Sequence, residues 1–271
     1  MTPALFQAFR DIAYTQAGIS LRDGKEALVS ARLVRRMRDL GLGSESEYLA
    51  YLEGDQSGEE MVKFLDAIST NFTSFYREKP HFDLLDEEAR EHLRQGGGRF
   101  RVWCAASSSG EEPYTIALTL ANAFEGSRVD YKILATDIST RVLSHARKGR
   151  YTERQIEPVP RELKARWFTR LDERVGDEAL YEVSPALRSR LVFKRLNLAT
   201  PPFPMTGPLD VIMCRNVMIY FDTAVRQRLI SEAERLLSPG GLLMIGHSET
   251  LNGIQTGLRA VRPTIYRKAG A

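Results

Sequence analysis

Short apolar or β-branched runs alternate with helical stretches from about residue 99 onward, and this alternation constrains the fold more than any other feature. Near-continuous apolar runs separated by helices are typical of parallel strands buried on both faces of a sheet. We therefore predict an α/β fold with a mostly parallel, doubly wound sheet. Helices are expected over 112–125, 139–147 and 223–237, and strands over 101–106, 131–137, 191–198, 209–216 and 241–248.

The rest of the chain suggests a division into parts. The first seventy residues carry no long alternating run, and TPALFQAFRDIAYTQAG places its apolar side chains on one helical stripe, so we expect a helical domain over 1–70. A linker over 71–98 precedes the α/β domain, which we expect to span 99–271. Residues 151–190 interrupt the alternation with three prolines and a possible hairpin, RVGDEALYEV, and we interpret them as an insertion between two strands of the sheet.

Signals near the C-terminus complete the predicted domain. Asp222 is expected to cap the helix over 223–237, and SPGG (238–241) is expected to end it. The tail LRAVRPTIYRKAG predicts an antiparallel pair at one edge of the sheet.

Composition excludes several classes of function. The net charge of +3 is too small to indicate nucleic-acid binding by itself. Cys104 and Cys214 lie in apolar runs, so we expect both to be buried and reduced, as in the cytoplasm. The absence of a Cys-x-x-Cys pair and of closely spaced histidines predicts no metal site. No apolar run reaches membrane-span length and the N-terminus lacks a signal-peptide core, so we expect a cytoplasmic protein that is not inserted in a membrane.

The loop after the first predicted strand, AASSSGEEP, restricts the class of ligand that can bind there. A helix start that binds a pyrophosphate needs bare N–H groups and several glycines, but this loop has only Gly110. Glu111 and Glu112 would repel a phosphate and suit a cationic ligand. S-adenosylmethionine carries a ribose, an adenine and a sulfonium but no phosphate, and it fits this loop. The alternative that the glutamates merely favour the helix dipole stays open, above all for Glu112.

Asp137 ends the second predicted strand. A carboxylate at that point can accept hydrogen bonds from the hydroxyls of a ribose. It could equally be a turn residue before a helix capped by Ser139.

Five motifs then resemble one family. They are STNFTSFYRE (69–78), RVWCAASSSGEEPYTIAL (101–118), ILATDIS (133–139), CRNVMIYFD (214–222) and GLLMIGHSE (241–249). In this order they resemble the CheR-type chemotaxis receptor methyltransferases. The resemblance implies a class I S-adenosylmethionine-dependent methyltransferase fold, with an N-terminal all-α domain and a small β-subdomain inserted at 151–190. It implies methylation of glutamate side chains on bacterial chemoreceptors for sensory adaptation, with S-adenosylhomocysteine as the product.

The resemblance also assigns site residues. Arg77 would pair with the methionine carboxylate, Asp137 with the ribose, and Asn197 with the adenine edge. Glu111 is preferred to Glu112 because of the spacing in the family. The full set of implied cofactor contacts is Asn71, Thr73, Arg77, Glu111, Asp137, Asn197, Leu198, Arg215 and Asn216.

The implied reaction requires few catalytic groups from the protein. A glutamate is already ionised at neutral pH, so direct displacement at a sulfonium methyl needs alignment and exclusion of water, but no general base or metal. Asn216 and Tyr220, with Arg215 nearby, are the candidates for positioning the acceptor; Tyr220 could instead serve packing. The run CRNVMIY lacks the Asp/Asn-Pro-Pro-Tyr motif of enzymes that methylate nucleobase amino groups, which argues against an amino acceptor.

A basic helix face suggests how a receptor could dock. Arg32, Arg35 and Arg36 fall on one face of a helix over 25–40, opposite an apolar face that includes Val34. A charged face is usually just solvated, but the resemblance implies contact with acidic receptor helices. Some family members also hold a C-terminal receptor pentapeptide on the β-subdomain; here the hairpin has a single glycine, Gly176, which argues against such tethering. We expect a monomer.

Two other classes of function are alternatives to this one. A nicotinamide-dependent oxidoreductase would need a G-x-G-x-x-G turn, which AASSSGEE lacks. A non-catalytic module that only binds receptors stays open from sequence alone.

Overall fold

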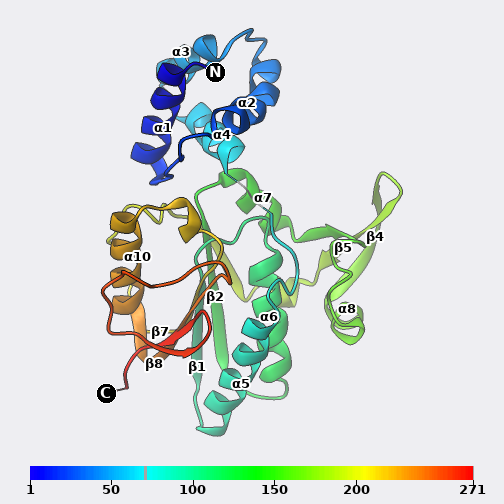
Figure 1. Cartoon of the computed structure of the whole chain (residues 1–271). Helices are drawn as coiled ribbons and strands as arrows, with labels where there is room; N and C mark the ends of the chain where they lie inside the picture. The colour runs from blue at the N-terminus through cyan, green and yellow to red at the C-terminus, as the bar shows by residue number, and fades with distance from the viewer. Residues whose placement is uncertain (70–71, 271) are drawn as a thin grey trace.

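The computed structural model describes residues 1–69 and 72–270, and it consists of a helical N-terminal domain above an α/β domain (Figure 1). Phe9 lies at the centre of the helical domain, with its ring 6.1 Å from that of Tyr48 and 5.6 Å from that of Phe64. Ser44 caps the third helix by accepting a hydrogen bond from the Glu47 N–H. The helices are α1 (Pro3–Ala17), α2 (Glu26–Leu40), α3 (Glu45–Gly54) and α4 (Glu59–Ile68).

The α/β domain is built on a seven-stranded sheet with the order β6-β2-β1-β7-β8-β10-β9. The first five strands are parallel, and their order matches a doubly wound sheet, which confirms the predicted fold class. The last two strands are antiparallel and confirm the predicted edge pair. The strands are β1 (Arg99–Cys104), β2 (Asp130–Asp137), β6 (Leu191–Arg195), β7 (Leu209–Cys214), β8 (Leu237–Ile245), β9 (Arg259–Arg262) and β10 (Ile265–Arg267).

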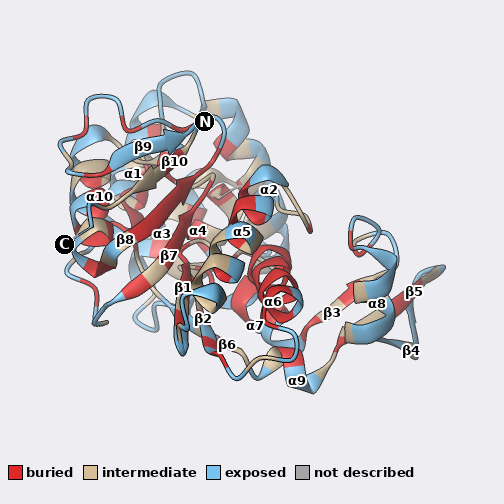
Figure 2. Cartoon of the chain, turned by 90° about the horizontal axis from the view of Figure 1, so that it is seen from below, coloured by how far each residue is buried: buried red, intermediate tan, exposed pale blue. Residues whose placement is uncertain are grey.

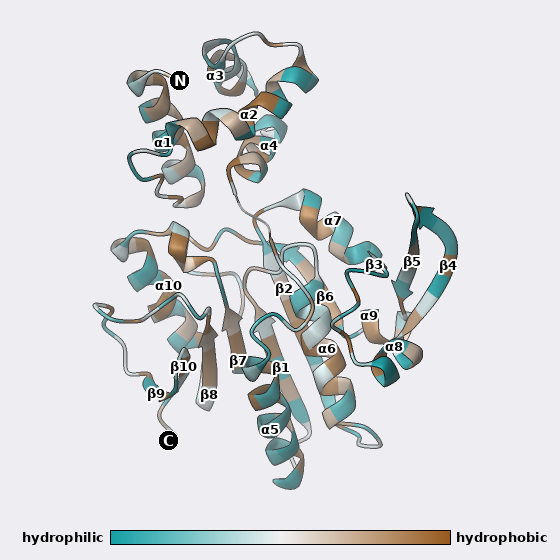
Figure 3. Cartoon of the chain, turned by 45° about the vertical axis from the view of Figure 1, so that its right-hand side comes forward, coloured by the Kyte–Doolittle hydropathy of each residue, from teal (hydrophilic) through white to brown (hydrophobic). Residues whose placement is uncertain are grey.

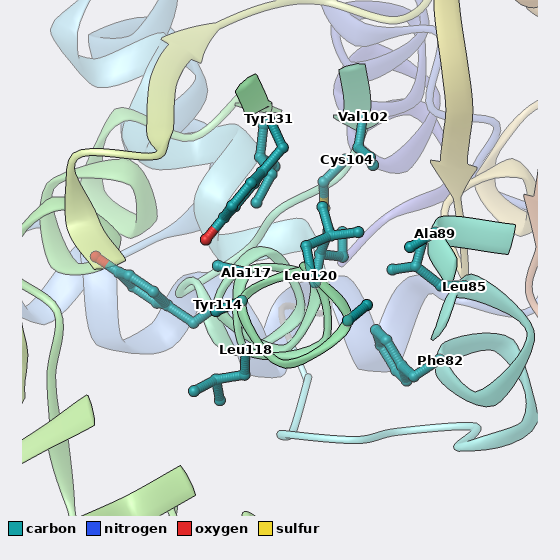
Figure 4. Packing of buried hydrophobic residues seen from close by; sticks show 14 of the residues in the cluster. Phe82, Leu85, Ala89, Val102, Cys104, Tyr114, Ala117, Leu118, Leu120 and Tyr131 are labelled. Atoms are coloured by element: carbon teal, nitrogen blue, oxygen red, sulfur yellow. The ribbon is translucent and has the colours of Figure 1, made fainter. Parts of the chain in front are cut away.

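Helices cover both faces of this sheet. Successive residues of β1 point to opposite faces: Val102 and Cys104 pack under α5 and α6, while Trp103 packs toward α10. Buried residues are concentrated in the central strands and in α6 (Figure 2), and side chains from α5 and β1 approach α6 from two sides (Figure 4). The covering helices are α5 (Pro80–Arg94), α6 (Glu111–Ala123), α7 (Thr140–Lys148) and α10 (Thr223–Leu236), with a 3-10 turn, η1 (Met218–Tyr220), before α10.

The insertion forms a separate three-stranded antiparallel sheet, β3-β5-β4, that projects from the domain and is largely hydrophilic along β4 (Figure 3). The predicted hairpin is present, with Gly176 at its turn in a left-handed conformation (φ +58°). Its elements are β3 (Arg150–Thr152), α8 (Arg161–Trp167), β4 (Phe168–Val175), β5 (Glu178–Val183) and α9 (Pro185–Arg188).

The end of α10 differs from the prediction. Asp222 caps its start by accepting the Val225 N–H at 2.8 Å, as expected. However, the helix ends at Leu236, and SPGG lies inside β8 instead of following the helix as a loop. A side chain at Gly241 would approach the Asp210 carbonyl oxygen at 3.0 Å, so this glycine permits close strand pairing.

Among residues 1–69 and 72–270, none of the helices combines the length and apolar character that a membrane crossing requires.

Candidate functional site

A pocket opens at the carboxyl ends of the parallel strands, where the strand order reverses between β1 and β7. In open α/β sheets this is the expected position of a ligand. Ala17 at the end of α1 and Ile19 just after it also line the pocket, so both domains form it. The lining residues are Ala17, Ile19, Ser69, Phe72, Thr73, Arg77, Ala105, Ala106, Ser108, Glu112, Asp137, Ile138, Leu196, Asn197, Leu198, Arg215, Asn216, Val217, Tyr220 and Phe221.

The loop after β1 is held tightly against the inserted subdomain. Tyr151 donates a hydrogen bond from its hydroxyl to the Ser109 carbonyl oxygen at 2.9 Å. A side chain at Gly110 would approach the same hydroxyl at 2.4 Å, and this glycine has a φ of +105°. Only glycine therefore fits at this start of α6.

The two glutamates at the start of α6 point in different directions. Glu111 lies outside the pocket lining and accepts a hydrogen bond from the Ser109 hydroxyl at 2.6 Å. Glu112 lies on the pocket wall and accepts from the Arg215 guanidinium at 2.8 Å. Burial raises the pKa of both carboxyls, and Arg215 opposes that rise for Glu112. The sequence prediction put Glu111 on the pocket; the rotation of α6 puts Glu112 there instead.

Asp137 lies on the pocket wall at the end of β2. Its two carboxylate oxygens accept the backbone N–H of Ser108 at 2.8 Å and of Ser139 at 3.0 Å. Burial raises its pKa. Each oxygen accepts only one of these bonds, so it can also accept a ligand hydroxyl. Asp137 therefore acts as a turn residue that organises the loop, and it also faces the pocket, as a ribose-binding residue would.

Asn197 and Leu198 also lie on the wall, two and three residues after β6 ends. The Asn197 amide donates to the Gln16 carbonyl oxygen at 2.8 Å and accepts the Ala199 N–H at 3.0 Å. These contacts hold the end of α1 against the strand-end loop. One amide hydrogen and one carbonyl lone pair remain for a ligand.

Arg215 is a fully buried cation at the base of the pocket. Its guanidinium donates to Glu112, to Glu78 at 3.0 Å and to the Arg77 carbonyl oxygen, and it lies 5.2 Å from the Phe82 ring centre. These contacts give Arg215 a role in holding the pocket together. Its Nε has no partner among the described residues, so the predicted roles of Arg215 in contacting the cofactor and positioning an acceptor stay predictions.

Asn216 has a left-handed backbone conformation, with φ of +57°. Two carboxylates fix it: Glu249 accepts its backbone N–H at 3.0 Å, and Glu78 accepts its side-chain amide at 3.1 Å. Glu249 also accepts the N–H groups of Met218 and Gly246 at 2.8 and 2.6 Å. An uncommon conformation held by several contacts is typical of functional sites.

Sequence reasoning missed Glu78 and Glu249 as parts of the site. Each is the last residue of a quoted motif, STNFTSFYRE or GLLMIGHSE, and that position was the available signal. Burial acts to raise the pKa of Glu78, but its bonds with Asn216 and Arg215 outweigh burial and lower it.

Three further predicted residues line the pocket: Thr73, Arg77 and Tyr220. Arg77 donates to the Phe72 carbonyl oxygen at 2.8 Å. Tyr220 also packs against the core of the helical domain, so its position serves both packing and the pocket. The predicted contact Asn71 lies outside the described residues.

Histidines that are distant in sequence meet beside this site. Ligand atoms of Glu78, His81 and His247 lie within 4.8 Å of one another, which their sequence spacing could not reveal. Burial lowers the pKa of His81 to about 4, so it is neutral at physiological pH. The Glu78 oxygens are already bonded to Arg215 and Asn216, so we assign this group to the scaffold of the pocket.

The predicted docking arginines have different environments. Arg36 donates to Glu60 at 2.6 Å and ties α2 to α4, and Arg32 donates to the Ile68 carbonyl oxygen. Arg35 is exposed. The expected apolar face is also incomplete, because Val34 is 43% exposed. Arg36 is thus ion-paired within the helical domain, and the docking role of the three arginines stays a prediction.

Comparisons with known proteins agree with this geometry. A family profile described as "CheR methyltransferase, SAM binding domain" matches residues 71–267, and one described as "CheR methyltransferase, all-alpha domain" matches residues 4–69. The fold and the cofactor domain thus define an S-adenosylmethionine-dependent methyltransferase of class I, and they confirm S-adenosylmethionine as the cofactor. More narrowly, the chain belongs to the CheR methyltransferase family.

Curated relatives cover almost the whole chain. A chemotaxis protein methyltransferase of Escherichia coli is 39% identical over 98% of this chain and 91% of the relative. Chemotaxis protein methyltransferase 2 of Pseudomonas aeruginosa is 42% identical over 97% and 92%, respectively. A chemotaxis protein methyltransferase of Borreliella burgdorferi is 38% identical over 95% and 91%. The recognition made from the five motifs is confirmed.

Proposed function

We propose that this protein transfers a methyl group from S-adenosylmethionine to glutamate side chains of bacterial chemoreceptors, which adjusts their signalling in chemotaxis. One observation carries the assignment to this pocket. Its lining combines Asp137, a strand-end carboxylate suited to binding ribose hydroxyls, with Glu112, a carboxylate at the start of α6 that would repel a phosphate. A phosphate-free, positively charged nucleoside suits that combination. Family membership supports the same cofactor.

We assign the cofactor contacts as follows. Asp137 accepts the ribose hydroxyls, while Ile138 and Leu198 form apolar walls beside the adenine. Arg77 pairs with the methionine carboxylate and Glu112 with the positively charged end of the ligand. Support comes from the position of all five side chains in the lining of one pocket and from the hydrogen bonds that already orient the two carboxylates.

The residues of the chain contribute alignment rather than proton transfer. S-adenosylmethionine supplies an electrophilic methyl group when bound. The acceptor glutamate is already ionised at neutral pH, so no side chain needs to remove a proton. Asn216 and Tyr220 border the space that the acceptor must enter, and their fixed backbone makes them suitable for orienting its carboxylate and excluding water.

Several finer features belong to the same proposal. Receptor docking uses the exposed Arg35 with Arg32, whereas Arg36 is excluded because Glu60 holds it. The protein acts as a monomer in the cytoplasm and is recruited to membrane receptor arrays. The single-glycine hairpin at Gly176 does not tether a receptor pentapeptide; micromolar binding of such a peptide would contradict this point.

Methyl transfer to receptor-containing membranes tests the function directly. Tritiated S-adenosylmethionine should label the receptor, and mild base should release the label as methanol because the product is an ester. Calorimetry should detect binding of both the cofactor and S-adenosylhomocysteine. Label that resists base would exclude a glutamate ester, and failure to bind either ligand would favour the non-catalytic alternative.

A further inference from the structure

Three segments that are distant in sequence bring metal-ligating side chains together beside the cofactor pocket. Glu78 precedes α5, His81 lies in the first turn of that helix, and His247 follows β8. One oxygen or nitrogen atom of each lies within 4.8 Å of the others, and this is the one such group of three among the residues that the structure describes. The side chains belong to the scaffold of the pocket, so anything that binds between them acts on that scaffold.

The ring of His81 has one nitrogen without a partner. The residue is 1% exposed, and its Nε2 lies 2.9 Å from the Thr264 hydroxyl. That hydroxyl donates its hydrogen to the Pro263 carbonyl oxygen, so Nε2 carries the ring hydrogen and donates it to Thr264. Nδ1 is therefore a bare lone pair, and it has no hydrogen-bond partner among the described residues. A buried acceptor that lacks a donor requires an explanation.

The unpaired nitrogen faces a carboxylate instead of a donor. His81 Nδ1 lies 3.6 Å from Glu78 Oε2, and the His247 ring centre lies 5.0 Å from that of His81. Two ligand atoms bound to one tetrahedral Zn²⁺ at about 2.1 Å lie about 3.4 Å apart. The separation of the first pair therefore already suits a zinc ion. The side chain of His247 is exposed, so it can turn toward the ion and leaves a path from solvent.

The surroundings of the group match those of protein metal sites. A histidine that binds a metal through one ring nitrogen usually donates the hydrogen of the other to a neighbouring acceptor, and Thr264 is that acceptor here. Glu78 has a left-handed backbone conformation, with φ of +57°, of the kind that clusters at functional sites. Its Oε1 accepts the Asn216 amide at 3.1 Å and the His247 backbone N–H at 3.2 Å, which fixes the orientation of the carboxylate.

The same geometry indicates the kind of ion and its effect. Two imidazoles and one carboxylate favour Zn²⁺ over Mg²⁺ and Ca²⁺, which prefer oxygen ligands alone. Arg215 is the main opposing charge, because its guanidinium donates to Glu78 Oε2 at 3.0 Å. A metal ion must therefore compete with Arg215 for that oxygen. A bound ion weakens the contact between Glu78 and Arg215, and it disturbs the support that Glu78 gives to Asn216.

We propose that Glu78, His81 and His247 form a site for a divalent transition-metal ion, Zn²⁺ in particular, whose binding lowers the rate of methyl transfer. The site is independent of the proposed function, whereas its effect on the rate rests on that function. Because Arg215 and Asn216 line the cofactor pocket, an ion that displaces their shared partner changes the pocket without entering it. The ion is then a regulator and takes no part in the reaction itself.

Calorimetry with the metal alone tests the site. The full chain, freed of metal by a chelator, should bind one Zn²⁺ with micromolar affinity, and Mg²⁺ should not bind there. His247→Gln removes an exposed ligand and should weaken the affinity for Zn²⁺ by at least about tenfold, since loss of an outer-shell partner alone costs that much in metal sites. Co²⁺ should give the visible absorption spectrum of a tetrahedral site in the wild type and lose it in the variant. A wild-type chain that binds no Zn²⁺ would overturn the proposal.

A second histidine variant supplies the matched control. His145 lies on α7, is also exposed and does not belong to the cluster. His145→Gln should therefore bind Zn²⁺ as the wild type does. Equal losses of Zn²⁺ affinity in the two variants, or wild-type affinity in His247→Gln, would overturn the assignment of the ligands.

A rate measurement then tests the effect on the enzyme. Saturating Zn²⁺ should lower kcat for a receptor cytoplasmic fragment by about tenfold relative to the rate in chelator, and later addition of chelator should restore it. His247→Gln, compared with its own rate in chelator, should be less sensitive at the same Zn²⁺ concentration. Binding of Zn²⁺ without a change in rate would contradict the inhibitory role. If the chain methylated no receptor at all, the proposed function would fail while calorimetry still decided the metal site, so the two failures are distinguishable.

Discussion

Two arginine–carboxylate clusters, one in each domain, show that the same interaction can have different functions. In the helical domain, Glu60 accepts hydrogen bonds from Arg36 and from the Tyr48 hydroxyl, which joins α2, α3 and α4. In the α/β domain, Arg215 binds Glu78 and Glu112 at the base of the pocket. The first cluster joins helices of the helical domain away from the cofactor pocket, whereas the second has that pocket on one side. We therefore expect loss of the first to cost stability and loss of the second to cost stability and cofactor binding together.

Removing the cation of the pocket cluster should give the largest effect. Arg215→Met removes the cation that pairs with both Glu78 and Glu112, so the free energy of unfolding should fall by about 3–5 kcal/mol. Affinity for S-adenosylhomocysteine should fall by about a hundredfold, since Glu112 loses the bond that fixes it. Urea denaturation and calorimetry measure the two quantities. Arg215→Lys keeps the charge and should recover part of both; a fully stable Met variant with normal affinity would remove the basis of the comparison.

Breaking the enclosed cluster should affect stability alone. Glu60→Gln removes the closer of the two carboxylates that pair with Arg36 and should lower the free energy of unfolding by about 3 kcal/mol. Below the melting temperature, affinity for S-adenosylhomocysteine should stay within about twofold of the wild type, because Glu60 is remote from the pocket lining. Thermal unfolding measures the stability, and calorimetry on the same sample measures the affinity. A large loss of affinity in a folded sample would mean that the two clusters are coupled.

The next effect tests a carboxylate that faces the ligand without a cation. Asp137→Asn should weaken binding of S-adenosylhomocysteine by about ten- to a hundredfold, as expected for hydrogen bonds to a charged group. Burial raises the pKa of Asp137, so wild-type affinity should decline on acidification at a higher pH than an exposed aspartate would cause. The Asn variant should lack this decline. Calorimetry from pH 7 to pH 4.5 follows it, and identical pH profiles would argue against a contact with Asp137.

The smallest effect compares two neighbouring glutamates. Glu112→Gln should weaken binding of S-adenosylhomocysteine by about tenfold, because Glu112 lies on the pocket wall. Glu111→Gln serves as the matched control and should change the affinity by less than about twofold. The reverse order of effects would restore the assignment of Glu111 that family spacing suggests.

Local patterns predicted much of the architecture. Apolar runs separated by helical stretches predicted the parallel sheet, and the tail predicted its antiparallel edge, because burial on both faces requires such runs. Asp222 predicted the start of α10 through a bond to its own first turn. The SPGG stretch was misread, since glycines that end a helix and glycines that permit close strand pairing look alike in sequence.

The site was predicted less completely, for a physical reason that Glu111 and Glu112 illustrate. Adjacent residues on a helix project about 100° apart, so the rotation of α6 against the sheet decides which of them faces the pocket. Packing against α5 and β1 sets that rotation. Likewise, Glu78 and Glu249 reach Asn216 only after segments more than thirty residues apart in sequence come together.

The sequence by itself therefore determined the fold class, the family and the chemical nature of the cofactor, since these depend on local periodicity and on residue types at strand ends. Tertiary structure decided which side chains face the pocket and which cations stay available for a partner. Arg36 and Arg35 are neighbours on the same basic helix, yet Glu60 neutralises Arg36 and leaves Arg35 exposed. Orientation and charge pairing depend on contacts between distant segments, which residue spacing alone does not contain.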